Sequence, residues 1–294
     1  MIKIDNNVVT VEHFPDGTQR IISDVLNYMA DFHDHVNITW NYENDEECMT
    51  LWYVAKHLKN TCQNIKLQLT MYYIPNARMD RVKSKNEVFT LKYFADFINT
   101  IGFDSVKVLD PHSDVSTALI NNVNVTDVNQ YISKAIWKIN TKEQLNDGEL
   151  FIYFPDSGAM KRYKDLKYIE GYNVLYGKKV RDWETGKILG LDIYDCNEIK
   201  LDHVEEEVSA LEGATVLMID DIISYGGTLA YSADKLRKLG AKNIYAYASH
   251  VENSILDEEK GTLIKRFENG DVKCVFTTDS LFNKFNDTKY VEKV

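Results

Sequence analysis

The sequence predicts an α/β protein with two mainly parallel sheets, each flanked by helices. Short apolar runs rich in β-branched residues alternate along the chain with segments of helical periodicity, and this alternation occurs in both halves. Strands that follow one another through a helix lie parallel and are joined by right-handed crossovers. Several of the apolar runs also end in acidic residues, as expected where ligands bind at the carboxyl ends of parallel strands.

Each element of the first half has a local signal. The segment 48–59 is expected to be helical because Leu51, Val54, Ala55 and Leu58 fall on one face. A second helical stripe consists of Val88, Leu91, Phe94, Ala95 and Ile98. Gly102 is placed to end that helix. The short apolar runs 65–69 and 106–109 are expected to be strands.

The second half repeats this order. Strands are expected over 150–154, 173–176, 215–219, 244–248 and 272–276, and helices around 162–169 and from the glycine-rich turn to Leu239. At 294 residues the chain exceeds the usual single core, so two domains are expected. The polar segment 141–148 marks the expected boundary. We therefore predict an N-terminal domain over 1–145 and a C-terminal domain over 146–294, whose last residues can pack back on the first.

The composition is that of a globular, acidic protein. Lys and Arg number 34 against 45 Asp and Glu, which gives a net charge of −11. This charge argues against a general binder of nucleic acids or anionic membranes. The four cysteines form no C-x-x-C pair, so neither a zinc site nor a disulfide framework is indicated. There is no signal-peptide pattern and no apolar run long enough to span a membrane, so a cytoplasmic protein is expected.

The segment TVLMIDDIISYGGT, from Thr215 to Thr228, is the most informative for function. Its apolar run delivers Asp220 and Asp221 to the end of a strand, and its glycine-rich turn opens a helix. Backbone N–H groups at a helix N-terminus bind phosphate, and carboxylates bind sugar hydroxyls or Mg²⁺. An ordinary connection from strand to helix has the same outline. The spacing DD-x-x-[ST]-x-G-G-T fixes acids, hydroxyls and glycines together and so favours ribose phosphate chemistry.

Two other expected strands lead into polar groups. Leu109 precedes Asp110-Pro111-His112, and Phe154 precedes Pro155-Asp156-Ser157-Gly158. We expect these groups to converge with Asp220 and Asp221. The segment 161–187 contains eight cations and four acids, and is either a solvated face or a binding surface for anions.

Six segments together resemble the ribose-phosphate pyrophosphokinases, and the resemblance covers nearly the whole chain. They are HFPDG at 13–17, YYIPNARMDR at 72–81, VLDPHSDV at 108–115, FPDSGAMKR at 154–162, KKVR at 178–181 and IDDIISYGGT at 219–228. The resemblance implies two type I phosphoribosyltransferase-like domains and a homo-oligomer built from dimers. It also implies Mg²⁺-dependent transfer of the β,γ-diphosphate of ATP to the anomeric hydroxyl of ribose 5-phosphate, with release of AMP.

On the ATP side, the resemblance implies that Phe14 and Asp16 contact adenine and that Arg78, Asp80 and His112 belong to the ATP site. His112 and Asp156 are the implied Mg²⁺ ligands. Taken without the resemblance, Arg78 and Asp80 could form a surface ion-pair cluster with Arg81, and His112 could be a structural histidine.

On the ribose side, Asp220 and Asp221 are implied to hold the ribose hydroxyls. The implied 5-phosphate loop consists of Ser224, Tyr225, Gly226, Gly227 and Thr228. Lys179 and Arg181 match the catalytic Lys-x-Arg of the family's flexible loop.

Ser224 and Tyr225 depart from the family's loop, which carries an Asp and a Thr at these positions. Less negative charge could admit a more anionic 5-substituent, and an aromatic ring could pack on a base or sugar. Two acceptors therefore stay open, ribose 5-phosphate and a ribose with an extended 5-phosphate such as ADP-ribose. Two other functions also stay open, a phosphoribosyltransferase that consumes phosphoribosyl diphosphate and a non-catalytic regulatory relative.

Overall fold

The computed structural model describes residues 1–26, 35–62, 64–146, 148–181, 188–201 and 211–294, and the side chains of 180, 181, 188 and 189 are not described. The chain divides into two compact units, Met1–Asp127 and Val128–Val294. Each unit contains a mainly parallel sheet with helices, as the sequence predicts. No helix in the described ranges is long and apolar enough to cross a membrane.

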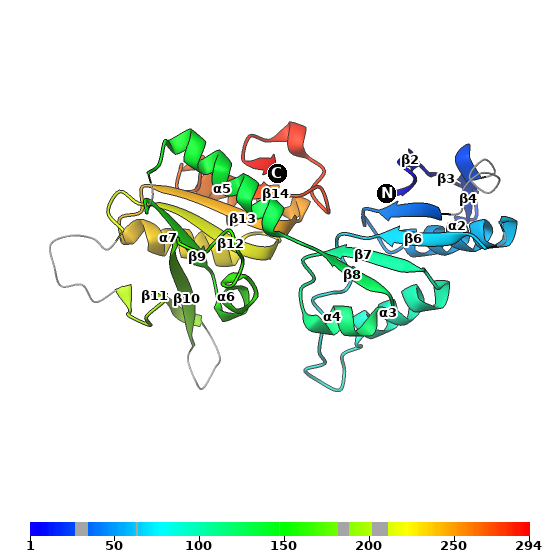
Figure 1. The fold of residues 1–294 in the computed structure, drawn as a ribbon, viewed down its shortest axis with the longest axis horizontal. Helices are drawn as coiled ribbons and strands as arrows, with labels where there is room; N and C mark the ends of the chain where they lie inside the picture. The colour runs from blue at the N-terminus through cyan, green and yellow to red at the C-terminus, as the bar shows by residue number, and fades with distance from the viewer. Residues whose placement is uncertain (27–34, 63, 147, 182–187, 202–210) are drawn as a thin grey trace. The chain divides into compact units, whose positions relative to one another are not determined.

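The first unit is built on a sheet of strand order β2-β1-β5-β6-β7-β8 (Figure 1). These strands are β1 (Ile2–Ile4), β2 (Asn7–Val8), β5 (His35–Trp40), β6 (Lys66–Thr70), β7 (Ser105–Leu109) and β8 (Val123–Thr126). The strands from β5 to β8 pair in parallel, whereas β1 is antiparallel to both of its neighbours. A separate hairpin consists of β3 (Thr10–His13) and β4 (Gln19–Ile22).

The helices of this unit are α2 (Glu47–Thr61), α3 (Thr90–Ile101) and α4 (Asp114–Leu119). α2 buries the predicted apolar stripe, and α3 buries Leu91, Phe94, Ala95 and Ile98 of the second stripe. Val88 was wrongly included in that stripe, because it precedes α3 and is exposed. Gly102 adopts the left-handed conformation that ends α3. These stripes pack on the alternate side chains of β5 and β6 that are fully buried, such as Ile38 and Leu67. This apolar core fixes the position of β7, and His112 lies in the loop that follows this strand.

The second unit has the strand order β11-β10-β9-β12-β13-β14-β15. Its strands are β9 (Leu150–Phe154), β10 (Asn173–Arg181), β11 (Ile188–Asp195), β12 (Thr215–Ile223), β13 (Asn243–Val251), β14 (Cys274–Thr277) and β15 (Val291–Lys293). All neighbours pair in parallel except β10 and β11, which are antiparallel. The helices are α5 (Asn129–Glu143), α6 (Ser157–Tyr163), α7 (Gly227–Lys238), α8 (Ile264–Glu268) and the 3-10 helices η2 (Asn253–Leu256) and η3 (Phe285–Asp287).

The sheet of the second unit separates two apolar cores. Along β13, Tyr245 and Tyr247 face the core that includes α5 and α6, whereas Ala246 and Ala248 face the core that includes α7 and α8. This alternation follows from the two-residue period of a strand. Both faces of the central strands are covered, so ligands can reach these strands only at their ends.

The helix expected over 162–169 lies earlier in the chain. α6 begins at Ser157 and ends at Tyr163, because Asp156 caps its first turn. Backbone hydrogen bonds of turns then connect Leu166 to Tyr163 and Ile169 to Leu166. The predicted helix at 162–169 is therefore wrong in position, and the shift gives Asp156 a defined orientation.

The division between the units falls before α5, whereas the sequence analysis placed the boundary at residue 145. The apolar stripe of α5, which includes Ile132 and Ile139, packs in the core of the second unit. Glu143 at its end accepts a hydrogen bond from the Asn243 side chain at 2.9 Å. The chain's last strand, β15, pairs with β14 and extends the second sheet.

Candidate active site

Asp156 lies just beyond the carboxyl end of β9 and is the N-cap of α6. Its Oδ1 accepts hydrogen bonds from the backbone N–H groups of Gly158 and Ala159 at 3.0 and 3.1 Å. Such a cap satisfies N–H groups that have no partner within the helix. The other oxygen, Oδ2, lies 3.4 Å from the Lys179 ammonium nitrogen. One carboxylate oxygen is therefore fixed by the helix, and the other is directed toward β10.

Lys179 and Asp220 flank Asp156 because β10 and β12 both continue past the end of β9. Tyr176 of β10 is level with Phe154, and Met218 of β12 is level with Tyr153. Residues that follow these positions therefore lie at the carboxyl ends of the parallel strands, on either side of Asp156. Asp156 thus lies near Lys179 and Asp220 within the second unit. Asp110 and His112, which were expected to converge with these acids, belong to the first unit.

Asp220 and Asp221 have different environments. Asp221 is buried, and its Oδ2 lies 3.0 Å from a guanidinium nitrogen of Arg162 on α6. The backbone N–H of Asp221 donates to Asp220 Oδ1 at 2.9 Å. Burial and then the charge of Asp221 raise the pKa of Asp220 well above its ordinary value, and the charge of Asp156 adds to this effect. At Asp220, the negative charge of the neighbouring carboxylates is therefore not fully offset by nearby cations.

The loop from Ser224 to Thr228 connects β12 to α7, as expected. Gly226 has φ +78°, and a Cβ at this position would lie 2.4 Å from the Leu263 Cβ. The Tyr225 carbonyl accepts hydrogen bonds from the backbone N–H of Thr262 at 3.0 Å and of Leu263 at 3.3 Å. α7 starts at Gly227, so the N–H groups of its first turn have no partner within the helix. The loop therefore has the form of an anion-binding helix N-terminus.

Arg181 is the last residue of β10, and its backbone pairs with Ile188 across a register shift. The Arg181 side chain lies outside the described residues. Gly177, on the same strand, approaches its neighbours closely, because a Cβ there would lie 2.4 Å from the Tyr153 hydroxyl oxygen. This close approach brings β10, with Lys179, against the end of β9.

In the first unit, Phe14 and Asp16 form the turn between β3 and β4. The Phe14 ring is 51% exposed. Asp16 Oδ1 accepts hydrogen bonds from the Thr18 hydroxyl at 2.7 Å and the Thr18 backbone N–H at 3.0 Å. The hydroxyl bond lowers the pKa of Asp16.

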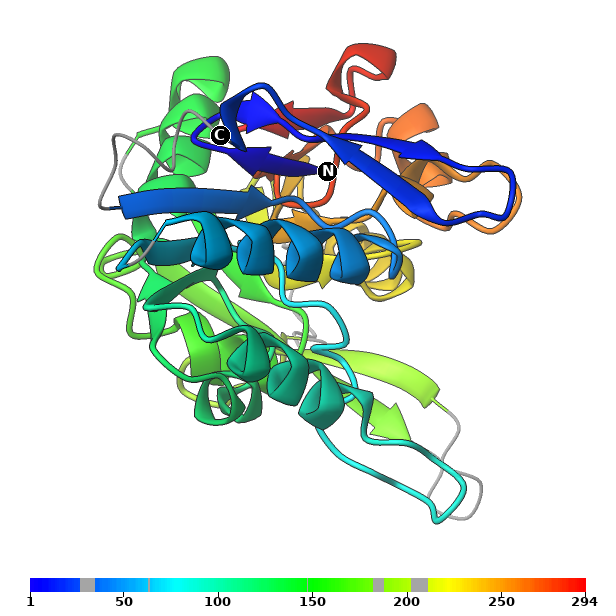
Figure 2. The same cartoon turned by 90° about the vertical axis from the view of Figure 1, so that its right-hand side faces the viewer.

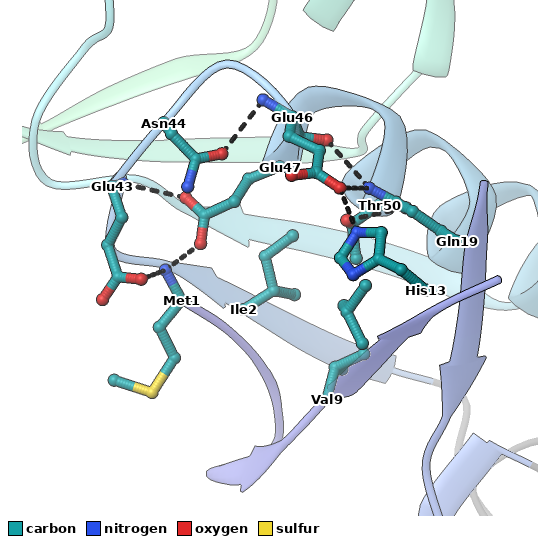
Figure 3. Close-up of a pocket in the computed structure, with 11 residues that line it drawn as sticks. Met1, Ile2, Val9, His13, Gln19, Glu43, Asn44, Glu46, Glu47 and Thr50 are labelled. Carbon is teal, nitrogen blue, oxygen red and sulfur yellow. Dashed lines mark hydrogen bonds and ion pairs between the residues drawn. The ribbon is translucent and has the colours of Figure 1, made fainter. Parts of the chain in front are cut away.

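Contacts with the start of α2 hold the last strand pair of this hairpin before its turn, His13 and Gln19 (Figure 3). His13 contacts the Glu46 carboxylate, Gln19 donates to the same carboxylate at 3.2 Å, and Thr50 donates to Gln19 at 3.0 Å. The His13 contact lowers the pKa of Glu46. A cavity of about 270 Å³ adjoins these residues. No motif in the sequence indicates these contacts, because they join residues about 30 positions apart.

Arg78 and Asp80 lie in the loop between β6 and α3, and Asp80 contacts Arg81 at 3.0 Å. His112 lies between β7 and α4 and is partly buried. Figure 2 shows the β3–β4 turn and the loop before α3 on different sides of the first unit. A single chain therefore does not bring Phe14 and Asp16 together with Arg78 and Asp80.

The described part of the chain contains no group of three or more His, Cys, Asp or Glu side chains placed to hold a metal ion. The two expected ligands, His112 and Asp156, belong to different units.

No protein-family model matches the chain. Curated relatives do: a ribose-phosphate pyrophosphokinase of Saccharolobus solfataricus is 26% identical over 254 residues, which cover 85% of this chain and 77% of the relative. One of Thermococcus kodakarensis is 28% identical over 249 residues, 82% of this chain and 77% of the relative. A crystal structure of phosphoribosylpyrophosphate synthetase from Mycobacterium smegmatis superposes with a TM-score of 0.68 at 18% identity, covering 98% of this chain and 86% of that one. The resemblance expected from the motifs is thus confirmed over most of the chain, the two-sheet fold is that of the solved synthetase, and the relatives are transferase enzymes.

Proposed function

We propose that the protein is a Mg²⁺-dependent pyrophosphokinase. It transfers the β,γ-diphosphate of ATP to the anomeric hydroxyl of ribose 5-phosphate, or of a ribose with an extended 5-phosphate such as ADP-ribose, and releases AMP. The convergence of Asp156, Lys179 and Asp220 beside the loop 224–228 carries the proposal. The similarity to curated ribose-phosphate pyrophosphokinases supports the same class of reaction.

The residues of the second unit suit the acceptor. Asp220 and Asp221 offer carboxylate oxygens that accept hydrogen bonds from the ribose hydroxyls. The first N–H groups of α7 donate to the phosphate attached to the ribose. Lys179 exchanges its contact with Asp156 for the transferred diphosphate, where it stabilises negative charge as the transfer proceeds. Arg181 is proposed to act in the same way.

The donor set fits Mg²⁺, which prefers carboxylate and phosphate oxygens. The neighbouring negative charges that raise the pKa of Asp220 are those that a divalent cation would offset. Asp156 is the proposed ligand from the second unit and His112 from the first, with substrate phosphates completing the set. When bound, the ion would neutralise charge on the phosphates of ATP.

The first unit is proposed to supply the ATP contacts. Phe14 and Asp16 are placed on an exposed turn, and Arg78 is exposed in the loop before α3. The Phe14 ring is exposed, and hydrogen bonds from Gln19 to Glu46 and from Thr50 to Gln19 hold its hairpin in place. Such a ring suits stacking on adenine. Because the turn and the loop lie on different sides of this unit, one ATP would contact two copies of the chain.

The extended acceptor is favoured by Tyr225. Its backbone is fixed through the hydrogen bonds to Thr262 and Leu263, whereas its ring is 39% exposed. A fixed, accessible ring beside the 5-phosphate loop can pack on the group attached to that phosphate.

AMP formation tests the proposal. The protein is incubated with ATP, Mg²⁺ and either ribose 5-phosphate or ADP-ribose, and AMP is quantified by chromatography. We expect acceptor-dependent AMP that disappears when EDTA removes the metal. Inertness of ADP-ribose beside an active ribose 5-phosphate would end the extended-acceptor option.

Two alternative functions predict different reaction products. A phosphoribosyltransferase, which shares the Asp-Asp and Gly-Gly-Thr pattern, would release pyrophosphate from phosphoribosyl diphosphate and a nucleobase without using ATP. A non-catalytic relative would bind ATP without forming AMP. The presence of Lys179, Arg181, His112 and Asp156 argues against this second alternative.

A further inference from the structure

An acidic side chain outside every recognised motif lies against the proposed 5-phosphate loop. The Ser224 hydroxyl donates a hydrogen bond to Oε2 of Glu252 at 2.7 Å. The Ser254 hydroxyl donates to the same oxygen at 3.1 Å. Both hydroxyls hold one carboxylate oxygen, so the Glu252 side chain has a fixed position beside the first residue of the loop.

The backbone supports this placement. The Glu252 N–H donates to the Ile223 carbonyl at 2.8 Å, so the segment that follows β13 runs beside the end of β12. Further along, Thr262 and Leu263 donate to the Tyr225 carbonyl. The segment 252–263 between these contacts contains four acids and one lysine. The segment that contacts the loop at both of its ends is therefore acidic, and Glu252 is the acid held directly against Ser224, which is unusual for a site that would bind a phosphate dianion.

The charge of a sugar phosphate depends on its linkage. A phosphomonoester carries close to two negative charges at neutral pH, because its second pKa is about 6. A phosphate joined to a second group through a diester or diphosphate bond has lost that second ionisable oxygen. A fixed carboxylate several ångströms away weakens binding by roughly tenfold for each additional negative charge on the phosphate held in the loop. In ADP-ribose the second charge lies on the outer phosphate, farther from the loop, where the repulsion is weaker.

We infer that Glu252 is a specificity-determining residue that disfavours phosphomonoesters at the 5-position. It favours a ribose whose 5-phosphate carries one charge because it is linked to a further group. The Ser224 hydroxyl contributes to this preference, since its hydrogen is donated to Glu252. The inference rests on the proposed function, because it requires that the loop 224–228 holds this phosphate.

Replacement of the carboxylate by an amide tests the inference. We expect Glu252→Gln to raise kcat/KM for ribose 5-phosphate by about tenfold and to change kcat/KM for ADP-ribose much less. Glu212→Gln is the matched control. It removes the same charge from an exposed residue that precedes β12, at the opposite end of that strand, and should leave the ratio of the two values unchanged. An unchanged ratio in Glu252→Gln overturns the inference.

A measurement on the unaltered protein covers the case in which that variant does not fold. Calorimetry without ATP gives the affinities for ribose 5-phosphate and ADP-ribose between about pH 5.5 and 7.5, the range in which a phosphomonoester loses its second proton. We expect the affinity for ribose 5-phosphate to fall relative to that for ADP-ribose as the pH rises. A constant or rising relative affinity overturns the inference.

The outcomes separate the two proposals. Failure of every acceptor to yield AMP, with no binding of either, overturns the proposed function and the inference with it. Formation of AMP together with an unchanged acceptor ratio overturns only the role of Glu252.

Discussion

Lys179 and Asp156 are both partly exposed in their 3.4 Å contact, so the ion pair contributes less than about 1 kcal/mol to stability. We therefore expect Lys179→Ala to fold normally and to lower the rate of AMP formation by about 10²-fold or more, because a charge-stabilising donor is lost. The rate is measured at saturating ATP and acceptor, and the fold is checked by thermal unfolding.

The neighbouring lysine is the control for this variant. The Lys178 ammonium lies over the rings of Tyr176 and Tyr194, away from Asp156. Lys178→Ala removes the same charge and should retain most of the activity. Equal rates in the two variants would contradict a catalytic role for Lys179.

Replacement of Asp220 is expected to make the protein more stable but less active. Because the folded-state pKa of Asp220 is raised from 3.8, the stability that its protonated form contributes is complete below that value and is lost as the pH rises through the folded pKa. Asp220→Asn should therefore increase the free energy of unfolding at pH 7 by on the order of 1 kcal/mol, with little effect near pH 3.8, while AMP formation falls. Urea unfolding at both pH values measures the difference.

Asp221 provides the contrast. Its carboxylate is buried beside the Arg162 guanidinium, so Asp221→Asn leaves a partly buried cation without its counter-ion and should destabilise the fold. If Asp220→Asn also destabilised the protein at pH 7, the assignment of an unfavourable charge at Asp220 would be contradicted.

At the scale of elements, the junction of β12 and α7 depends on Gly226. Its positive φ and the nearby Leu263 side chain leave no room for a Cβ. We expect Gly226→Ala to destabilise the protein by about 1–3 kcal/mol and to weaken acceptor binding, because the loop must move. Gly227→Ala is the stability control, since a Cβ there would meet only the Thr262 hydroxyl, at 3.6 Å. A stability loss of equal size in both variants would contradict this explanation.

Elements with a continuous apolar signal were predictable. The runs that became β6, β7, β9, β12 and β13 and the stripes of α2 and α3 are encoded within a few residues. β8, at the edge of its sheet, was not predicted because its partial burial leaves a weak periodicity. β1, β5 and β11 were not predicted either. α6 lies earlier than predicted because the Asp156 cap starts the helix at Ser157, before the apolar pattern on which the prediction depends.

The site was predictable in its residue types and only partly in its contacts. The acids of β9 and β12 were expected to meet because both strands are parallel, and they do. The pairing of Arg162 with Asp221 and of Ser224 with Glu252 could not be foreseen, since each joins residues far apart in sequence through tertiary packing. Glu252 in particular belongs to no recognisable pattern.

At the scale of the whole molecule, the division into two units separates the proposed ATP contacts from the proposed ribose contacts. α5 lies in the second unit because its apolar stripe is buried there, although the polar segment that follows it resembles a linker. Burial of an amphipathic face, which a sequence indicates only as a pattern, decides to which unit a helix belongs.

The arrangement of the first unit leads to a test with mixed subunits. The turn that carries Phe14 and the loop that carries Arg78 lie on different sides of the unit, so both can contact one ATP only if two chains contribute. Phe14→Ala and Arg78→Ala are each expected to have low activity through a higher KM for ATP. After mixing and reassembly, a Phe14→Ala chain can supply an intact Arg78 to the intact turn of an Arg78→Ala chain.

Random pairing of equal amounts would make about a quarter of the sites intact, and AMP formation at sub-saturating ATP should recover to roughly that share of the unaltered rate. A mixture of either variant with itself, treated identically, is the control and should not recover. If the mixed sample stays as inactive as its components, although labelled chains exchange between oligomers, then Phe14 and Arg78 do not contribute to one site from two chains. The assembly would then have no part in forming the ATP site.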